Sequence, residues 1–325
     1  MPFRNLDNAF QRFFSKTSGF PTFKKKNNGG SIQYPQHMSV DFKRSKVALL
    51  KVGEVFCRFD RQFTGKIKTC TVSKTPTDKF FISILVENDL KLPNKKAIDE
   101  LNAIGIDLGL KDFAILSNGQ KIPNSKFLHN LLDRLKVLQH RASKKQKESN
   151  NRRKANLKVA LLNEKISNQR SDFLHKLSSK IISENQTIIL EDLNVAGMIK
   201  NHKLAQAISD VSWSKFVEFL TYKAEWYGKN LIQIGRFEPS SKLCSNCGWK
   251  NTELKLKDRE WYCQECHILH DRDINAAINI KKFGLIKAKS GSGRPAVLVE
   301  ELSNTHVREG KSKTVRRNKK PSALC

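Results

Sequence analysis

Two cysteine pairs constrain the fold of this chain more than any other feature of its sequence. Cys244 and Cys247 are separated by two residues, as are Cys263 and Cys266, and fifteen residues lie between the pairs. This spacing allows two tight turns to close a tetrahedral site around one zinc ion. Because four thiolates fill such a site, we expect a structural zinc with no open coordination position.

The other cysteines and the nearby histidines do not extend this pattern. Cys57, Cys70 and Cys325 are scattered, and the sequence assigns no function to them. Paired cysteines of this kind are typical of metal binding in a reducing cytosol and not of a disulfide framework. His267 and His270 follow the second pair, but four thiols are already available, so we expect neither histidine to be a ligand.

A strand pattern surrounds Asp107, in the stretch IGIDLG of residues 104–109. Apolar residues alternate there with small or polar ones, which predicts a half-buried strand. A carboxylate in such a strand is costly unless something compensates its charge. The next stretch, DFAILSNGQKI, predicts a hairpin, because Asn118-Gly119 is a strong two-residue turn signal.

Helices and two further strands follow in the second half of the chain. Residues 125–186 predict a helical hairpin, and the apolar run Ile188–Leu190 predicts a central strand buried on both faces, which ends at Glu191. We expect one helix over residues 203–228, a short strand in LIQIGRFEP, and a final helix in DRDINAAINIKKFGL.

The first hundred residues have a different character. The stretch NLDNAFQRFF predicts a helix, and β-branched and aromatic runs between residues 31 and 90 predict a small antiparallel sheet or barrel. The polar segment 91–100 is a plausible domain boundary. From about residue 288, Gly, Ser, Lys and Arg dominate, so we expect a disordered tail.

The charge of the chain indicates a polyanionic partner. Lys and Arg number 60 against 31 acids, a net charge of +29, and an excess of this size repels itself unless nucleic acid is present. Between residues 141 and 170 there are ten basic and two acidic residues, with no Pro or Gly. An ordinary solvated helix face would mix the signs, so we predict a phosphate-binding surface there. Our candidates for phosphate contact are Lys144, Lys145, Arg152, Arg153, Lys154 and Lys158.

Three acids lie in matching contexts on the predicted elements. Asp107 lies on the first strand, Glu191 ends the central strand, and Asp273 opens the last helix. Carboxylates that converge repel one another unless a cation joins them, and Mg²⁺ prefers carboxylate oxygens. We therefore expect the three acids to hold a catalytic Mg²⁺ pair of the kind used in phosphodiester cleavage. Asp271, two residues earlier, is the alternative to Asp273 as the third acid.

Four ordered motifs carry a resemblance to a known family. They are IGIDLGLKDFAIL, ILEDLNVAGM, RFEPSSKLCSNCG and HDRDINAAINI. Together they resemble the OrfB/TnpB family encoded by bacterial insertion sequences, which is related to the compact type V CRISPR nucleases. The resemblance covers residues 5–285. By position, Asp107, Glu191 and Asp273 match the catalytic acids of that family.

The resemblance implies a fold class and a domain plan. It implies an α/β, RNase H-like (RuvC) nuclease domain with helical and zinc-ribbon insertions, preceded by a β-barrel-like wedge domain. The expected parts are the N-terminal helix and wedge domain (1–98), the first nuclease part (99–238) with a helical insertion at about 125–186, the zinc ribbon (239–270), the final nuclease helix (271–287) and a disordered basic tail (288–325).

The same resemblance implies an activity. Such proteins bind a guide RNA from their own element and cut DNA next to a short motif, so the expected partners are DNA and guide RNA. The sequence has no run of 18 or more apolar residues, so we expect no membrane association. We expect a cytoplasmic, nucleoid-associated monomer. The family resemblance also places Met1 inside what looks like the last helix of an N-terminal lobe, so we expect a truncated chain whose activity is open.

The sequence leaves two other functions open. A strand-transferring transposase also uses acids on an RNase H-like fold, and a decayed nuclease could persist as a non-catalytic DNA- or RNA-binding regulator. The three acids argue against the regulator, and the missing N-terminal part argues for it. Asn194, Ser240 and Ser241 also lie in these motifs, and the sequence does not decide between substrate contact and a cap or turn role for them.

Overall fold

The computed structural model describes residues 2–22, 30–236, 238–255 and 257–290. Most of the expected disordered tail, with Cys325, lies outside these residues. The chain divides into two compact units. The first contains Met1–Lys91 and Lys136–Glu164, and the second contains Leu92–Leu135 and Lys165–Cys325. Among the helices of the described ranges, none combines the length and the hydropathy that a transmembrane segment needs.

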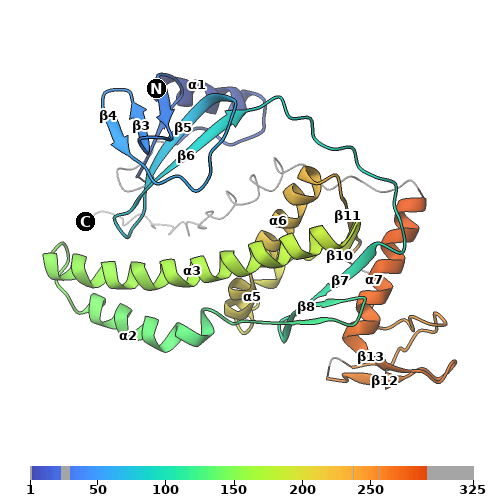
Figure 1. Ribbon diagram of the computed structural model, residues 1–325. Coiled ribbons are helices and arrows are strands. Elements are labelled where there is room, and N and C mark those ends of the chain that lie inside the picture. The colour runs from blue at the N-terminus through green and yellow to red at the C-terminus, as the bar shows by residue number, and fades with distance from the viewer. Residues whose placement is uncertain (1, 23–29, 237, 256, 291–325) are drawn as a thin grey trace, which may run out of the picture. The chain divides into compact units, whose positions relative to one another are not determined.

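The second unit is built on a five-stranded mixed sheet in the order β11-β10-β7-β8-β9 (Figure 1). Antiparallel hairpins connect β7 (Ala103–Leu108), β8 (Asp112–Leu116) and β9 (Lys121–Pro123). The strands β10 (Thr187–Glu191) and β11 (Asn230–Ile234) run parallel to β7. The sheet and its helices confirm the mixed α/β class, and the hairpin at Asn118-Gly119 is where the turn signal predicted it.

Helices lie on both faces of this sheet. On one face, Ile189 packs with Ile280 and Leu285 of α7 (Arg272–Lys289). On the other face, Ile188 and Leu190 belong to the larger core, which also includes α6 (Trp213–Trp226) and the second half of α3 (Asn150–Glu184). Ile188, Ile189 and Leu190 are all buried, which confirms a central strand covered on both faces.

Two glycines allow α7 to approach the sheet closely. A Cβ at Gly105 of β7 would lie 2.7 Å from the backbone nitrogen of Lys281 and even closer to the carbonyl oxygen of Ala277. A Cβ at Gly284 of α7 would collide with the side chain of Ile189 on β10. The helix packs this closely because neither glycine has a side chain. This close packing sets the position of α7 on the sheet, including its first turn.

The helix expected over residues 203–228 is two helices in the structure. The first, α5 (Ala205–Val211), ends at Ser212, and α6 begins at Trp213. Ser212 has the left-handed backbone conformation, with φ of 58°, which a continuous helix does not accommodate. The prediction of one helix was wrong because the apolar period continues across the break, while the backbone does not.

The first unit contains α1 (Pro2–Phe14) and two three-stranded antiparallel sheets. Their strand orders are β1-β5-β6 and β2-β3-β4, and a common core containing Val47, Leu49 and Cys70 lies among them. Within the described residues, the two ladders are separate and do not form one closed barrel. The strand bounds are β1 (Gly30–Tyr34), β2 (Met38–Asp41), β3 (Lys46–Leu49), β4 (Gly53–Phe56), β5 (Lys66–Lys74) and β6 (Phe80–Glu87).

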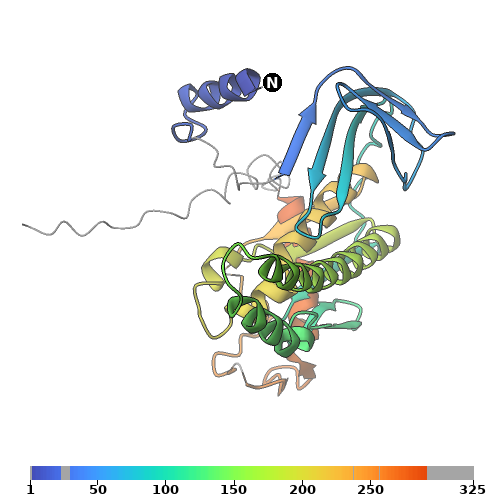
Figure 2. The same ribbon diagram turned by 90° about the vertical axis from the view of Figure 1, so that its left-hand side faces the viewer.

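The predicted helical hairpin is present. A short 3-10 helix (His129–Leu131) leads into α2 (Leu132–Ser143), and α3 follows after a turn. Residues 136–143 of α2 lie beside the first half of α3 (Figure 2). Where the hairpin begins, in the second unit, the buried carboxylate of Asp210 accepts from the backbone N–H groups of Leu128 and His129 and pairs with Arg170 at 2.7 Å.

Candidate functional site

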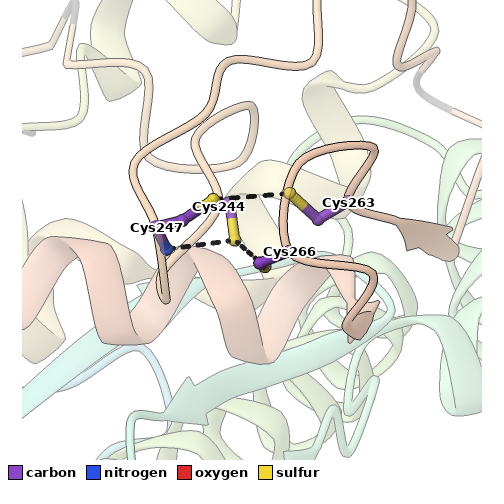
Figure 3. Close-up of side chains that lie close together, drawn as sticks. All are labelled: Cys244, Cys247, Cys263 and Cys266. Carbon is purple, nitrogen blue, oxygen red and sulfur yellow. Dashed lines mark hydrogen bonds between the residues drawn. The ribbon is translucent and has the colours of Figure 1, made fainter.

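The four predicted cysteines come together in one cluster (Figure 3). Their sulfur atoms all lie within 4.8 Å of one another, with Cys244 3.6 Å from Cys266 and Cys247 3.5 Å from Cys263. Zn–S bonds of about 2.3 Å in a tetrahedron separate the sulfurs by about 3.8 Å. The thiols therefore fit a single zinc ion, and no other residue type is needed to complete its coordination.

Local backbone geometry builds the two knuckles of this cluster. Gly248 has φ of 80° and donates its N–H to the Cys244 carbonyl, so the chain reverses directly after the first pair. In the second knuckle, His267 donates its N–H to the Cys263 carbonyl. The strands β12 (Glu260–Tyr262) and β13 (Leu269–Asp271) flank this second turn and pair with each other.

The two histidines are not part of the cluster of four sulfurs. His267 is exposed, whereas His270 is buried, tilted against the Trp261 ring, and its Nε2 lies 3.0 Å from Cys244 Sγ. Burial lowers the pKa of His270. His270 therefore contacts a cysteine of the cluster directly, a contact that the sequence did not indicate.

The sheet brings two of the predicted acids to the same edge. Leu190 pairs with Ile106 in the parallel β10–β7 ladder, and Glu191 and Asp107 are the next residues of these strands. Burial, together with the charges of Glu191 and Asp273, raises the pKa of Asp107 to about 8. The third acid, Asp273, thus lies near enough to Asp107 to act on it, although it belongs to α7.

Asp107 forms no ion pair with any of the described residues. Among the described residues, no side chain forms an ion pair or hydrogen bond with its carboxylate, and the charge of Arg272 lowers its pKa only in part. A buried carboxylate without a cation is costly. The oxygen donors of the three acids are those that Mg²⁺ prefers, so this edge of the sheet fits a hard divalent cation.

Glu191 is held by a serine. Ser240 donates its hydroxyl to Glu191 Oε1 at 2.6 Å. Burial raises the pKa of Glu191, and the bond from Ser240 offsets part of this rise. Ser240 thus has a defined contact with a candidate acid, which the sequence left open. Asn194, by contrast, caps the short helix α4 (Val195–Met198) by accepting from the N–H of Gly197.

Asp271 and Asp273 have different local roles. The carboxylate of Asp271 caps the first turn of α7, accepting from the N–H groups of Asp273 and Ile274, and pairs with Lys121 at 2.5 Å. Burial raises the pKa of Asp271, but these donors outweigh it and hold the pKa below its usual value. Asp273 pairs with Arg259 and Arg272, at 3.3 and 3.5 Å. Asp271 is therefore committed to the helix cap, which favours Asp273 as the acid that faces Asp107.

The three acids do not form a cluster as tight as the thiols. Within the described residues, the four cysteines bring their ligand atoms within 4.8 Å of one another, and the three acids do not come that close together. A pair of ions about 3.5–4 Å apart spreads its ligands over a wider space than one ion does. The arrangement is therefore compatible with ligands shared between two ions, and it does not form a preformed single-ion cage.

The candidate phosphate contacts fall into two groups. The side chains of Lys144, Lys145, Arg153, Lys154 and Lys158 are exposed at the turn of the hairpin and along α3. Arg152 is half-buried and donates to the Lys145 carbonyl at 2.9 Å, so its side chain braces the turn between the helices. The sequence pattern could not separate this arginine from its exposed neighbours.

Comparison with known proteins identifies the family. Residues 81–202 match the OrfB_IS605 family, described as a probable transposase, and residues 213–280 match the Cas12f1-like TNB domain. A Streptomyces pristinaespiralis protein is 40% identical over 89% of this chain and 72% of its own length. The Escherichia coli K12 protein InsQ is 31% identical over 90% of this chain and 76% of its own.

The two relatives share one name, and one solved structure shares the fold. Both relatives carry the name "Putative RNA-guided DNA endonuclease". A structure of a Cas12f1–sgRNA–target DNA complex matches 86% of this chain and 69% of that chain with a TM-score of 0.54 and 16% identity, which shows a shared fold. The similarity to relatives over most of the chain shows that this chain belongs to the OrfB/TnpB family.

Proposed function

We propose that this chain is an RNA-guided, Mg²⁺-dependent DNA endonuclease. The observation that carries the proposal is the Asp107 carboxylate, which lies near Glu191 and Asp273 and forms no ion pair with any of the described residues. The names of the relatives support the substrate and the guide, since both are named as RNA-guided DNA endonucleases. The Cas12f1 complex, which contains sgRNA and target DNA, supports the same two partners.

Each acid has a definable role in this proposal. Bound Mg²⁺ would lower the pKa of a water molecule and stabilise the leaving oxygen of the cleaved phosphodiester. Asp107 and Glu191 would hold the cation from adjacent strand ends, and Asp273 would hold it from the first turn of α7. Because the pKa of Asp107 is about 8, its carboxyl group gives up a proton when it becomes a ligand.

The architecture of the chain supports the same function. The strand order β11-β10-β7-β8-β9 supports an RNase H-like (RuvC) nuclease domain, into which the hairpin of α2 and α3 and the cysteine-bearing ribbon are inserted. The thiol geometry supports one structural zinc. The two sheets of the first unit, with their common core, would form the wedge domain, and the protein would act as a monomer.

Cleavage of a plasmid library with randomised flanking sequence tests the function. The protein is co-expressed with the RNA transcribed from its own element, and we expect Mg²⁺-dependent cuts that depend on the guide. The variant Asp107→Ala should stop cutting and keep RNA binding, and the exposed acid Asp89→Ala should cut like the wild type. Cutting by Asp107→Ala would contradict the metal assignment. Joined DNA ends would indicate a strand-transferring transposase, and RNA or DNA binding without any cut would indicate a regulator.

A further inference from the structure

The segment of residues 240–245 connects the cysteine cluster to the acids. It begins at Ser240, whose hydroxyl binds Glu191 Oε1, and it contains Cys244. Ser240 is 8% exposed, so its hydroxyl is largely shielded from bulk water. We infer that Ser240 is a positioning residue for Glu191, and that α7 and the zinc knuckle together hold Ser240 in place. This inference rests on the proposed function, because it treats Glu191 as a metal ligand.

Two buried asparagines of α7 hold this segment. Asn279 donates from Nδ2 to the carbonyl oxygens of Ser240 and Leu243, at 2.8 and 2.7 Å. Asn275 donates to the Leu243 carbonyl at 2.7 Å and accepts from the N–H of Ser245 at 2.8 Å. Asn275 is only 1% exposed and Asn279 only 3%. The backbone on both sides of Cys244 is therefore fixed to the helix.

Asparagine is the residue type that these contacts need. Its carboxamide offers a donor and an acceptor at one position, and Asn275 uses both. An aspartate would place a second acceptor opposite the Leu243 carbonyl, and an alanine would leave buried backbone groups without partners. Asn275 and Asn279 are four residues apart on α7, so they lie on the same face of the helix.

One helix thus positions two parts of the acid site. Asp273 lies in the first turn of α7, two residues before Asn275. The asparagines fix the knuckle segment, whose first residue binds Glu191 on β10. The bond occupies Oε1 of Glu191 and fixes the rotation of the carboxylate, so that Oε2 has a set direction for a cation. Zinc in the four thiols would lock the far end of the same segment.

Mn²⁺ binding to the purified protein without nucleic acid tests the role of Ser240. Electron paramagnetic resonance measures free Mn²⁺ during a titration, and zinc content and thermal unfolding are recorded for each variant. We expect Ser240→Ala to weaken Mn²⁺ binding by about tenfold with zinc content unchanged. Ser240→Thr keeps the hydroxyl and should stay within twofold of the wild type. Ser183→Ala, which removes an exposed hydroxyl bonded only within α3, is the matched control and should have no effect.

Separate variants test whether α7 and the zinc knuckle hold Ser240 in place. Asn279→Ala should also weaken Mn²⁺ binding, and its effect should not add to that of Ser240→Ala in the double variant. Cys266→Ser should do the same if its thermal unfolding shows a folded protein, and Cys57→Ser is its control. If Cys266→Ser does not fold, Asn279→Ala alone decides the link. Additive effects, or an Asn279→Ala protein that binds Mn²⁺ like the wild type, would overturn it.

A further variant separates this inference from the proposed function. Asp107→Asn removes a proposed ligand and leaves Ser240 in place. If Asp107→Asn weakens Mn²⁺ binding and Ser240→Ala does not, Ser240 is not a positioning residue and the metal site stands. If Asp107→Asn has no effect either, the acids do not bind the metal, and both the proposed function and this inference are wrong.

Discussion

Asp107 lies at the end of β7 with its ionised form disfavoured. Its pKa is about 8 in the native protein, chiefly because of burial, against 3.8 as the ordinary value. Between these values the native state binds a proton that the unfolded state does not. The free energy of unfolding therefore falls as the pH rises from about 4 to about 8 when no divalent cation is present.

A divalent cation competes with this proton, which gives a prediction for Mg²⁺. We expect Mg²⁺ to raise the melting temperature more at pH 8.5 than at pH 6, because at pH 6 it must displace the proton from Asp107. Differential scanning fluorimetry at both pH values measures this difference. The neutral variant Asp107→Asn should lose the pH dependence of the Mg²⁺ effect. An equal Mg²⁺ effect at both pH values in the wild type would contradict the assignment.

Cys263 should be needed for stoichiometric zinc binding. Its side chain is fully buried within the small core of the ribbon, beside Trp261 and Leu254. Cys263→Ser removes one of four ligands, so we expect bound zinc to fall well below one per chain. Hydrogen exchange should speed up over residues 240–270, and Cys57→Ser, in the first unit, should keep its zinc. Stoichiometric zinc in Cys263→Ser, by mass spectrometry under native conditions, would exclude the four-thiol site.

Regular elements of the fold were predictable where one local pattern decides them. The apolar run Ile188–Leu190 predicts a strand buried on both faces, and Asn118-Gly119 predicts the hairpin turn, because both patterns act over a few residues. The break at Ser212 was not predictable, since it depends on one left-handed residue within a continuous apolar period. The Ser240–Glu191 bond joins residues 49 apart in sequence, so no spacing rule indicates it. The cysteine cluster needed only the spacing of its pairs.

The close packing of α7 on the sheet should make the protein sensitive to any side chain at Gly105. Gly105→Ala would place a methyl group against the backbone of α7, which cannot move aside as a side chain can. We expect the free energy of unfolding to fall by about 1–3 kcal/mol in urea denaturation. The variant Gly19→Ala, where nothing lies within 4 Å of the added Cβ, is the control. Equal stability of Gly105→Ala and the wild type would show that α7 does not pack as closely as described.

The whole molecule carries a charge of +29, and its surface positions are not equivalent. On α3, Lys154 and Lys158 are exposed, and no ion pair links either of them to another residue in the described chain. Lys176 and Lys180 on the same helix pair with Asp172 and Glu184, at 2.7 and 4.0 Å. Uncompensated cations release more counterions from a nucleic acid than compensated ones do. The hairpin half of α3 should therefore contribute more to binding than the other half.

The salt dependence of DNA binding measures this difference directly. The double variant Lys154→Gln/Lys158→Gln removes two uncompensated charges. We expect the negative slope of the logarithm of the DNA association constant against the logarithm of the salt concentration to become shallower by about 1.8. Lys176→Gln/Lys180→Gln changes the net charge by the same amount on the same helix, but its slope should change by much less. Fluorescence anisotropy with one duplex over a range of salt concentrations gives both slopes. Equal changes in the two variants would mean that binding follows the total charge, and the proposed phosphate surface at the hairpin would then be wrong.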